Sequence, residues 1–386
     1  MLKKNKKKIL YIINHTAFFV SHRLPLAEEA RKLNYKISLI TGVSSSKTME
    51  KNSLKIIKRK KIKFKRSFFS SSSLNIFSEF FGLCQIIYHC KKIKPDIIHT
   101  ASPKANILGG IVAKLINVPC LVISVSGQGH IFTEKKKMSN FIISKFYKIV
   151  LKFILKHKNK KIILQNSQDY KEYCKLDKKK NCILIPGSGV DTKKFDKINP
   201  ICNSKNILLP SRILKDKGVL EFVEAAKIIK KKYPDWNFVI VGPIDYNNPS
   251  AIPKKHLKKW VKEKIIKWID YTTDIVKIYK NSSIVCLPSH REGFSKVLIE
   301  AGASARPVVT SDVPGCREAI KPGFTGEVFK LNNQKQLEQK IVKLINNKKL
   351  RLKYGNYGRK FVKKNFEIKK IIKKNLEIYN CLIKNV

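Results

Sequence analysis

The stretch KKILYIINHTAFFVSHRLPLAEEARKLNYKISLIT, residues 7–41, decides the fold class of this chain. Its first part, residues 7–14, is a short apolar run rich in β-branched side chains, which is typical of a buried strand. An amphipathic segment with helical spacing follows over 21–34, and a second apolar run follows at 36–41. A strand, a helix and a strand in this order predict a βαβ unit, whose two strands are parallel.

The same alternation of apolar runs and amphipathic segments continues to residue 185. Residues 185–206 are rich in Gly, Pro, Asn and Asp, and the alternation then begins again. We therefore predict an α/β protein of two doubly wound, Rossmann-like domains that face each other across a cleft. Beyond residue 311 the pattern predicts only helices. The predicted boundaries are 1–195, 205–365 and 366–386, the last a helix that packs back on the N-terminal domain.

Ligands of such sheets bind beyond the carboxyl ends of the strands, so the loops after strands matter most for function. The predicted strands end at Asn14, Thr100, Val125, Ser211, Gly242 and Ser289.

The composition indicates an anionic partner and a reducing compartment. The formal charge is +54, from 81 Lys+Arg against 27 Asp+Glu, and such an excess is typical of proteins that bind anions. A codon bias toward Lys, Ile and Asn explains the charge equally well. Nine cysteines occur without any C-x-x-C pair, which is typical of free thiols in the cytosol. We find neither a cleavable signal nor an uncharged apolar run of about 18 residues, and we predict a protein that does not span a membrane.

Two glutamates stand eight positions apart in REGFSKVLIE, residues 291–300. The run before this segment is a predicted strand and the run after it is a predicted helix, with Ser295 as its N-cap. Such a turn binds anions through backbone N–H groups and the helix dipole, and Gly293 lets the backbone approach a ligand closely. Glu292 and Glu300 would flank the anion, where each carboxylate can accept hydrogen bonds from sugar hydroxyls. The alternative is a pair of surface glutamates that offset nearby lysines.

A second strand-to-helix turn, PSRILKDKG at 210–218, carries Arg212 and Lys217. We expect both cations at the sheet edge that also holds the glutamates. Cations placed there stabilise the negative charge that grows on a leaving diphosphate. The sequence has no D-x-D pair for a divalent ion, so we predict chemistry without a metal or another cofactor. The alternative is two solvated residues at the start of a helix.

Four segments together resemble the retaining glycosyltransferases of family four, also called group one. They are REGFSKVLIEAGASARPVVTSDVPGCREAI, PSRILKDKGVLEFVEAAKIIK, IPGSGVDTKKF and FFVSHRLPLAEEARKLNYKISLIT. The resemblance spans nearly the whole chain and favours the branch that extends lipid-linked oligosaccharides. It implies the GT-B fold and a retaining, metal-independent transfer of a hexose or N-acetylhexosamine from a nucleotide sugar, UDP-linked. The implied acceptor is a polyprenyl-linked or other lipid-linked saccharide in surface polysaccharide, lipopolysaccharide or glycan assembly.

The same resemblance implies roles for the residues of both turns. Glu300 would bind the ribose hydroxyls, and Glu292 would be the catalytic carboxylate beside the donor sugar. Arg212 and Lys217 would hold the diphosphate. The implied donor-binding residues are Arg212, Lys217, Gly293, Phe294, Ser295 and Glu300.

The N-terminal domain is expected to supply the acceptor side. The segment SVSGQGHIFTE at 124–134 follows a strand, so Gln128 and His130 can enter the cleft. Many relatives place a histidine of this domain near the donor sugar, which makes His130 the candidate catalytic histidine; the alternative is that it only shapes the loop. Arg23 and His99 also lie near strand ends and are candidates for the acceptor side, although lone histidines are more often structural.

Two basic segments predict attachment to a membrane surface. Residues 51–66 carry nine cations and no acid, and residues 135–161 combine lysines with apolar residues. A basic amphipathic surface of this kind binds the anionic inner face of a membrane. We therefore predict a cytoplasmic protein held peripherally on the inner face of the cytoplasmic membrane. The alternative is a packed helix with a solvated, lysine-rich outer face.

Two other function classes explain part of the sequence. The charge alone supports nucleic-acid binding, but the cations are spread over both halves and no reading module is present, so no nucleic acid is predicted as a partner. A sugar-nucleotide epimerase can have the same two-lobed fold. The spacing of Glu292 and Glu300 favours transfer over epimerisation.

Overall fold

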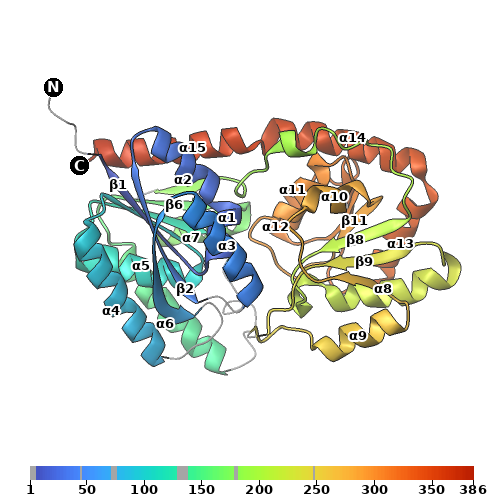
Figure 1. Ribbon diagram of the computed structural model, residues 1–386, viewed down its shortest axis with the longest axis horizontal. Helices are drawn as coiled ribbons and strands as arrows, with labels where there is room; N and C mark the ends of the chain where they lie inside the picture. Colours follow the sequence, from blue (N-terminus) through green and yellow to red (C-terminus); the bar gives the residue numbers. More distant parts are fainter. Residues whose placement is uncertain (1–5, 44–45, 71–75, 128–137, 178–180, 247) are drawn as a thin grey trace. The chain divides into compact units, whose positions relative to one another are not determined.

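The computed structural model describes residues 6–43, 46–70, 76–127, 138–177, 181–246 and 248–386 (Figure 1). The chain divides into two compact units. Unit 1 comprises Met1–Ser188 with Ile372–Val386, and unit 2 comprises Gly189–Ile371.

The first boundary, between Ser188 and Gly189, lies inside the stretch 185–206 that is rich in Gly, Pro, Asn and Asp, and a few residues before the predicted limit at 195. The hydrogen bonds show why. Val190 forms a parallel bridge with Glu367, and its N–H donates to the carbonyl of Phe366 at 3.0 Å. The hydroxyl of Thr192 donates to the carboxylate of Glu367. These bonds attach the chain after Ser188 to unit 2.

Unit 1 is built on a seven-stranded parallel sheet in the order β3-β2-β1-β4-β5-β6-β7. Its strands are β1 (Lys8–Ile13), β2 (Lys36–Val43), β3 (Lys63–Ser70), β4 (Ile97–Ala101), β5 (Cys120–Val125), β6 (Lys160–Leu164) and β7 (Cys182–Leu184). Five consecutive residues of β1 are buried, because helices cover both faces of a parallel sheet. The strand order reverses between β1 and β4, as in a doubly wound fold.

The helices of unit 1 depart from the sequence pattern at one place. They are α1 (Thr16–His22), α2 (Leu24–Lys32), α3 (Lys47–Arg59), α4 (Ile76–Ile93), α5 (Pro103–Leu115), α6 (Met138–Ile154), α7 (Ser167–Leu176) and, from Ile372 on, α15 (Ile368–Lys384), which starts in unit 2. The helical segment predicted at 21–34 is broken at Arg23, since Pro25 occupies the first turn of α2 and starts a new helix there. Within the described ranges, no helix has both the length and the apolar character needed to cross a membrane.

The last turns of α15 belong to the core of unit 1. The hydroxyl of Tyr379 lies 2.9 Å from the hydroxyl of Tyr11 on β1. The side-chain amide of Asn159 donates to the carbonyl of Leu382 at 2.9 Å. Both tyrosines are fully buried, so α15 packs against the sheet of unit 1.

Unit 2 repeats the same architecture with six parallel strands in the order β10-β9-β8-β11-β12-β13. Its strands are β8 (Asn206–Pro210), β9 (Asn237–Val241), β10 (Lys267–Ile269), β11 (Ile284–Leu287), β12 (Val308–Ser311) and β13 (Gly326–Phe329). Its helices are α8 (Val219–Lys232), α9 (Lys254–Lys262), α10 (Ile275–Lys280), α11 (Lys296–Ala303), α12 (Pro314–Arg317), α13 (Gln334–Asn346) and α14 (Lys348–Asn365). The predicted pair of doubly wound, Rossmann-like units is confirmed.

The prediction that only helices follow residue 311 is wrong, because it missed β13. This strand has four residues, GEVF, and its Glu327 is buried. Lys340, Lys343 and Tyr354 hydrogen-bond to the carboxylate at 2.6–2.8 Å. Burial alone would raise the pKa of Glu327, but these three bonds outweigh it and lower the pKa. A charged residue inside so short a strand interrupts the apolar run by which a buried strand is recognised in a sequence.

Candidate active site

The loops after β8 and β11 meet at the switch point of the unit 2 sheet. These two strands are neighbours and pair in parallel, with Ile207 opposite Ile284 and Leu208 opposite Val285. Their carboxyl ends therefore lie at one edge of the sheet. The loop after β8 runs over 211–218 and the loop after β11 over 288–295. A doubly wound sheet binds its ligand at this position.

An ion pair joins the two loops. The ammonium of Lys217 lies 2.6 Å from Oε1 of Glu292, and the two side chains are 21% and 14% exposed. The backbone supports this pair, because the N–H of His290 and the hydroxyl of Ser289 both donate to the carbonyl of Asp216, at 2.8 and 3.0 Å. The structure thus brings together two residues that the sequence placed in separate turns.

Two glycines permit close packing against the loop after β11. Gly218, at the end of the loop after β8, has a φ of +72°, and a Cβ on it would lie 2.0 Å from the carbonyl oxygen of Pro288. A Cβ on Gly315, in α12, would lie 2.3 Å from the carbonyl oxygen of Glu292. A side chain at Gly218 would push the two loops apart, and one at Gly315 would push α12 away from the loop after β11.

Arg212 is held by an acid that the sequence analysis did not single out. Its Nη1 lies 2.7 Å from Oδ2 of Asp245, which is buried in the loop after β9. Arg212 itself is exposed at the carboxyl edge of the sheet. Its planar guanidinium offers several N–H donors, only one of which is needed for Asp245, so it can also bind a phosphate group.

The start of α11 agrees in part with the predicted helix start, in which Ser295 is the N-cap. The hydroxyl of Ser295 accepts a hydrogen bond from the N–H of Leu298 at 3.4 Å and so caps the helix. Phe294 is buried, and its ring packs on the ring of Phe366 with centroids 5.1 Å apart. The side chain of Phe294 therefore belongs to the core of unit 2, and the N–H of Ser295 donates to the carbonyl of Gly315 at 3.0 Å.

Glu300 lies one helical turn after Lys296 and is 16% exposed. Its Oε2 accepts a hydrogen bond from the hydroxyl of Tyr279 at 3.3 Å, and its Oε1 lies 3.7 Å from the ammonium of Lys296. Burial raises the pKa of the Glu300 carboxyl, and the charge of Lys296 offsets part of that rise. Tyr279 is a partner that the sequence pattern did not reveal.

A second pair supports the loop after β11. Nε2 of His290 lies 2.6 Å from Oε1 of Glu221, in the first turn of α8. This hydrogen bond raises the pKa of His290 against the opposing effect of burial. The sequence pattern did not single out His290, the residue directly before the motif REGFSKVLIE.

The candidate site residues from the N-terminal half are either buried or outside the described residues. Both ring nitrogens of His99 are used, Nε2 by Ser124 at 2.7 Å and Nδ1 by Tyr379 at 2.5 Å, and the ring is fully buried. Burial, with the charge of Arg23, holds the pKa of His99 well below its ordinary value. Arg23 is also buried, and its Nη1 donates to the carbonyl of His22 at 3.1 Å.

These placements differ from the expectation for the acceptor side. His99 forms part of the core of unit 1 and has no ring nitrogen left for a ligand in this structure. Gln128 and His130 lie outside the described residues, so their roles stay predictions, as does the role of Arg23.

Two family models match the chain. The model described as glycosyl transferases group 1 matches residues 190–361, and the model described as glycosyl transferase 4-like matches residues 8–166. The first covers the loops that carry Arg212, Lys217, Glu292 and Glu300.

Curated relatives and solved structures agree with these matches. The chain is 32% identical over 304 residues to the N,N'-diacetylbacillosaminyl-diphospho-undecaprenol alpha-1,3-N-acetylgalactosaminyltransferase of Campylobacter jejuni, covering 74% of this chain and 77% of that protein. It is 30% identical to the UDP-Gal:alpha-D-GlcNAc-diphosphoundecaprenol alpha-1,3-galactosyltransferase of Escherichia coli, covering 75% and 76%. The structure of sucrose-phosphate synthase from Thermosynechococcus elongatus superimposes with a TM-score of 0.78 at 16% identity, covering 98% and 100%, and shows a common fold.

Proposed function

The chain belongs to the group 1 glycosyltransferases and has the GT-B fold, and we propose that it moves a sugar from a UDP-sugar to a polyprenyl-diphosphate-linked saccharide. The proposed sugar is a hexose or an N-acetylhexosamine. The proposed acceptor follows the two relatives, whose names each specify a saccharide on diphospho-undecaprenol. The reaction would extend a surface polysaccharide, lipopolysaccharide or another glycan.

The observation that carries this proposal is the pairing of cations and carboxylates at the switch point of unit 2. Lys217 uses one of its three N–H donors on Glu292, which leaves donors for a diphosphate oxygen. Arg212 stands on the same loop, after β8, and can bind a second oxygen. The negative charge that grows on the diphosphate would then be stabilised by fixed cations.

In the proposed reaction, Glu292 and Glu300 have different roles. The bond between the anomeric carbon and the diphosphate oxygen breaks, and its electron pair stays on the diphosphate. A hydroxyl of the acceptor then bonds to the same carbon from the same face and gives its proton to the departing diphosphate, so the configuration is retained without an enzyme nucleophile. Glu292 would interact with the positive charge on the sugar, and Glu300 would hold the ribose of the nucleotide.

An exposed row of aromatic side chains supports membrane attachment. Phe77, Phe80, Phe81 and Tyr88 follow one another at helical spacing on α4, which we call the α4 aromatic stripe. Phe77, Phe80 and Phe81 are 78%, 61% and 58% exposed. Single exposed aromatics are ordinary, but four on one face of a helix mark an interaction surface.

Cations lie at one end of this stripe. Lys91 and Lys92 are exposed at the end of α4, with the Lys92 ammonium 4.5 Å from the centroid of the Tyr88 ring. Helix α5 packs against both α4 and α6 (Figure 1). On α6, Ile149 and Phe153 are exposed among lysines. Aromatic side chains with a basic border suit an anionic lipid surface, where each cation contributes about 1 kcal/mol.

We accordingly place the enzyme on the cytoplasmic face of the membrane as a peripheral protein. All nine cysteines are free, as expected of a protein in a reducing compartment. A lipid-linked acceptor would then be reached without a spanning helix in the part of the chain that the structure describes.

The test is a panel of donors against one lipid-linked acceptor. Purified enzyme is incubated with UDP-galactose, UDP-N-acetylgalactosamine, UDP-glucose or UDP-N-acetylglucosamine and with a short polyprenyl diphosphate that carries N-acetylglucosamine. Mass spectrometry should show the acceptor heavier by one sugar with one of the donors, and far less product in the same time with Glu292→Gln. Conversion of a donor to its epimer, with the acceptor unchanged throughout the panel, would favour the epimerase alternative.

A further inference from the structure

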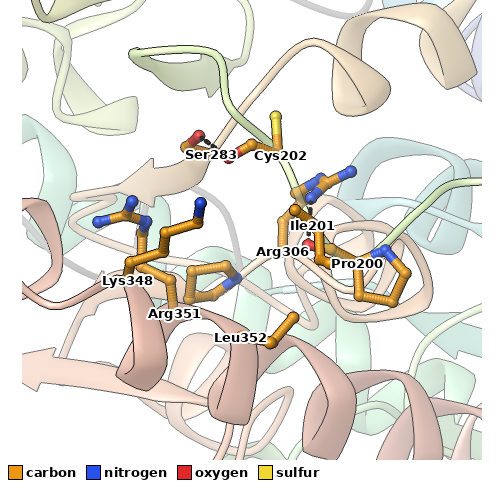
Figure 2. A pocket seen from close by; sticks show the side chains of 9 residues that line it. Pro200, Ile201, Cys202, Ser283, Arg306, Lys348, Arg351 and Leu352 are labelled. Carbon is orange, nitrogen blue, oxygen red and sulfur yellow. Dashed lines mark hydrogen bonds between the residues drawn. The ribbon is translucent and has the colours of Figure 1, made fainter.

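A hollow lies at the edge of the unit 2 sheet opposite the candidate active site. Cys202 comes shortly before β8, Ser283 directly before β11, and Pro307 directly before β12, so all three stand at the amino ends of strands. The loops of the candidate active site follow the carboxyl ends of β8 and β11. The residues that line the hollow are Pro200, Ile201, Cys202, Ser283, Arg306, Pro307, Lys348, Arg351 and Leu352 (Figure 2).

Three of these nine residues are basic and none is acidic. Arg306 is only 2% exposed. Its Nε, Nη1 and Nη2 donate to the carbonyl oxygens of Tyr279, Pro200 and Asn199 at 3.0, 3.0 and 2.8 Å. These bonds satisfy the donors, but carbonyl groups carry no net charge. The positive charge of Arg306 is therefore not balanced by a carboxylate in the described part of the chain.

Lys348 and Arg351 add two positive charges from the first turn of α14. Arg351 donates from Nη1 to the carbonyls of Leu344 and Ile345 at 2.6 and 2.8 Å. The contact of Lys348 with Asn203 is long, at 3.4 Å. Figure 2 shows the Lys348 side chain extending from α14 toward Ser283 and Cys202. The positive end of the α14 dipole adds to the same field.

The half-buried thiol of Cys202 lies at the wall of this hollow. Its sulfur lies 3.1 Å from the hydroxyl of Ser204. Burial acts to raise the pKa of Cys202, but hydrogen bonds with Ser204 and Ser283 and the charge of Arg306 outweigh burial and lower it. The serine hydrogen bonds and the charge of Arg306 thus stabilise a negative atom at the wall of the hollow.

We infer that this hollow is a binding site for the phosphate group of a small soluble anion, held by Arg306, Lys348 and Arg351. The hollow itself is small, about 30 Å³, and opens to solvent, so only phosphate oxygens would enter it and the rest of the anion would lie in solvent. The hydroxyl of Ser283 can donate to the bound oxygens, and Pro307 and Leu352 form an apolar wall. The inference goes beyond sugar transfer and does not depend on it.

The reactivity of Cys202 reports on this site directly. The full-length protein is treated with iodoacetamide, a neutral reagent, and the alkylation of each cysteine is followed by peptide mass spectrometry. Inorganic phosphate and glycerol phosphate are compared with sodium chloride at equal ionic strength. We expect phosphate and glycerol phosphate to slow alkylation of Cys202 several-fold, because a bound anion covers the thiol and neutralises the cations that stabilise the thiolate. The exposed Cys84 and Cys381 serve as internal controls whose rates stay unchanged.

Variants separate the pocket from general effects of charge. Lys348→Glu should abolish the protection of Cys202, whereas Lys349→Glu, which changes an exposed lysine outside the hollow, should keep it. Lys217→Gln should also keep it, because that residue stands at the other edge of the sheet. The assay needs no donor and no transfer, so failure of the proposed function would not alter its result.

Three outcomes would overturn the inference. One is an effect of phosphate no larger than that of sodium chloride, and another is protection that Lys348→Glu leaves intact. The third is protection by phosphatidylglycerol vesicles but by neither soluble phosphate, which would assign the cations to a lipid surface instead.

Discussion

Two lysine–glutamate pairs of nearly equal geometry stand at different places in the two sheets. Lys217 and Glu292 in unit 2 lie 2.6 Å apart with side chains 21% and 14% exposed. Lys104 and Glu79 in unit 1 also lie 2.6 Å apart, with side chains 18% and 22% exposed. The first pair joins loops that follow adjacent strands at a switch point, whereas the second joins helices α5 and α4. The position in the topology therefore distinguishes a candidate binding site from a contact between helices.

At the switch point of unit 1, the short loops directly after β1 and β4 carry no lysine, arginine or carboxylate. There, between β1 and β4, the hydroxyl of Ser102 donates to the side-chain carbonyl of Asn14, and His15 caps α1 through its Nδ1. Ser102 has a φ of +91°, a conformation that costs a residue with a side chain about 1–3 kcal/mol and is found mostly at functional sites. A neutral edge suits the hydroxyls of a saccharide, and a charged edge suits a diphosphate.

The largest expected effect is on the rate of transfer. Glu292→Gln keeps the size of the side chain but removes the charge that would stabilise the sugar cation, and we expect kcat to fall about a hundredfold or more. Steady-state kinetics measures this, with Glu79→Gln as the matched control that leaves kcat unchanged. Similar small losses in both variants would erase the distinction between the two pairs.

Glu300→Gln should act mainly on donor binding. Loss of a charged hydrogen-bond acceptor for the ribose costs about 1–3 kcal/mol, so the KM for the donor should rise about tenfold while kcat changes less. The same kinetic assay with varied donor concentration decides this. A fall in kcat at unchanged KM would move Glu300 from the nucleotide to the reacting sugar.

Membrane attachment should depend on the α4 aromatic stripe of unit 1 and on salt. Replacing Phe77, Phe80 and Phe81 by serine should weaken binding to phosphatidylglycerol vesicles at least about tenfold, since a buried phenylalanine contributes about 1.5–3 kcal/mol. Co-sedimentation measures binding, and Phe324→Ser provides an exposed aromatic control in unit 2. High salt should also release the protein, because surface charges are screened within about 8 Å at physiological ionic strength. Release by detergent alone would contradict this account.

The pair of His290 and Glu221 should give unit 2 a small dependence of stability on pH. The pKa of His290 is raised in the folded state, so its contribution is fully present below the unfolded pKa and is lost as pH rises through the folded pKa. The Tm difference between wild type and His290→Gln should therefore shrink with rising pH. The pair is partly exposed, so the contribution is less than about 1 kcal/mol. A difference that grows with pH would show that the pair stabilises in another way.

Removal of metal ions by a chelator should leave the transfer activity unchanged. Arg212 and Lys217 supply the positive charge that a divalent ion would otherwise supply. Transfer activity with EDTA should equal activity with added Mg²⁺ or Mn²⁺. A strict requirement for either ion would show that the cations of unit 2 are insufficient.

Local patterns predicted the sheets and the position of the candidate site. The apolar runs gave most of the strands, and the rule on carboxyl ends of strands placed Lys217 and Glu292 at one edge. The N-cap at Ser295 was also predictable, because its cause lies within one turn of the helix.

Contacts between distant segments were beyond the reach of these patterns. Asp245 as the partner of Arg212, Tyr279 as the partner of Glu300 and the direct bond between Lys217 and Glu292 each join residues from different loops or helices. The burial of His99 depends on Tyr379, 280 positions away in the chain. A side chain near a strand end faces either the core or the ligand, and only its partners decide which.

The most direct test of the central claim is calorimetric titration of UDP into wild type, Lys217→Gln and Lys104→Gln. The two variants remove the same charge from pairs of equal length and similar exposure. If the switch point of unit 2 holds the diphosphate, Lys217→Gln should weaken UDP binding about tenfold or more, and Lys104→Gln should bind as tightly as wild type. Equal affinities for all three proteins would contradict the account, as would a loss confined to Lys104→Gln.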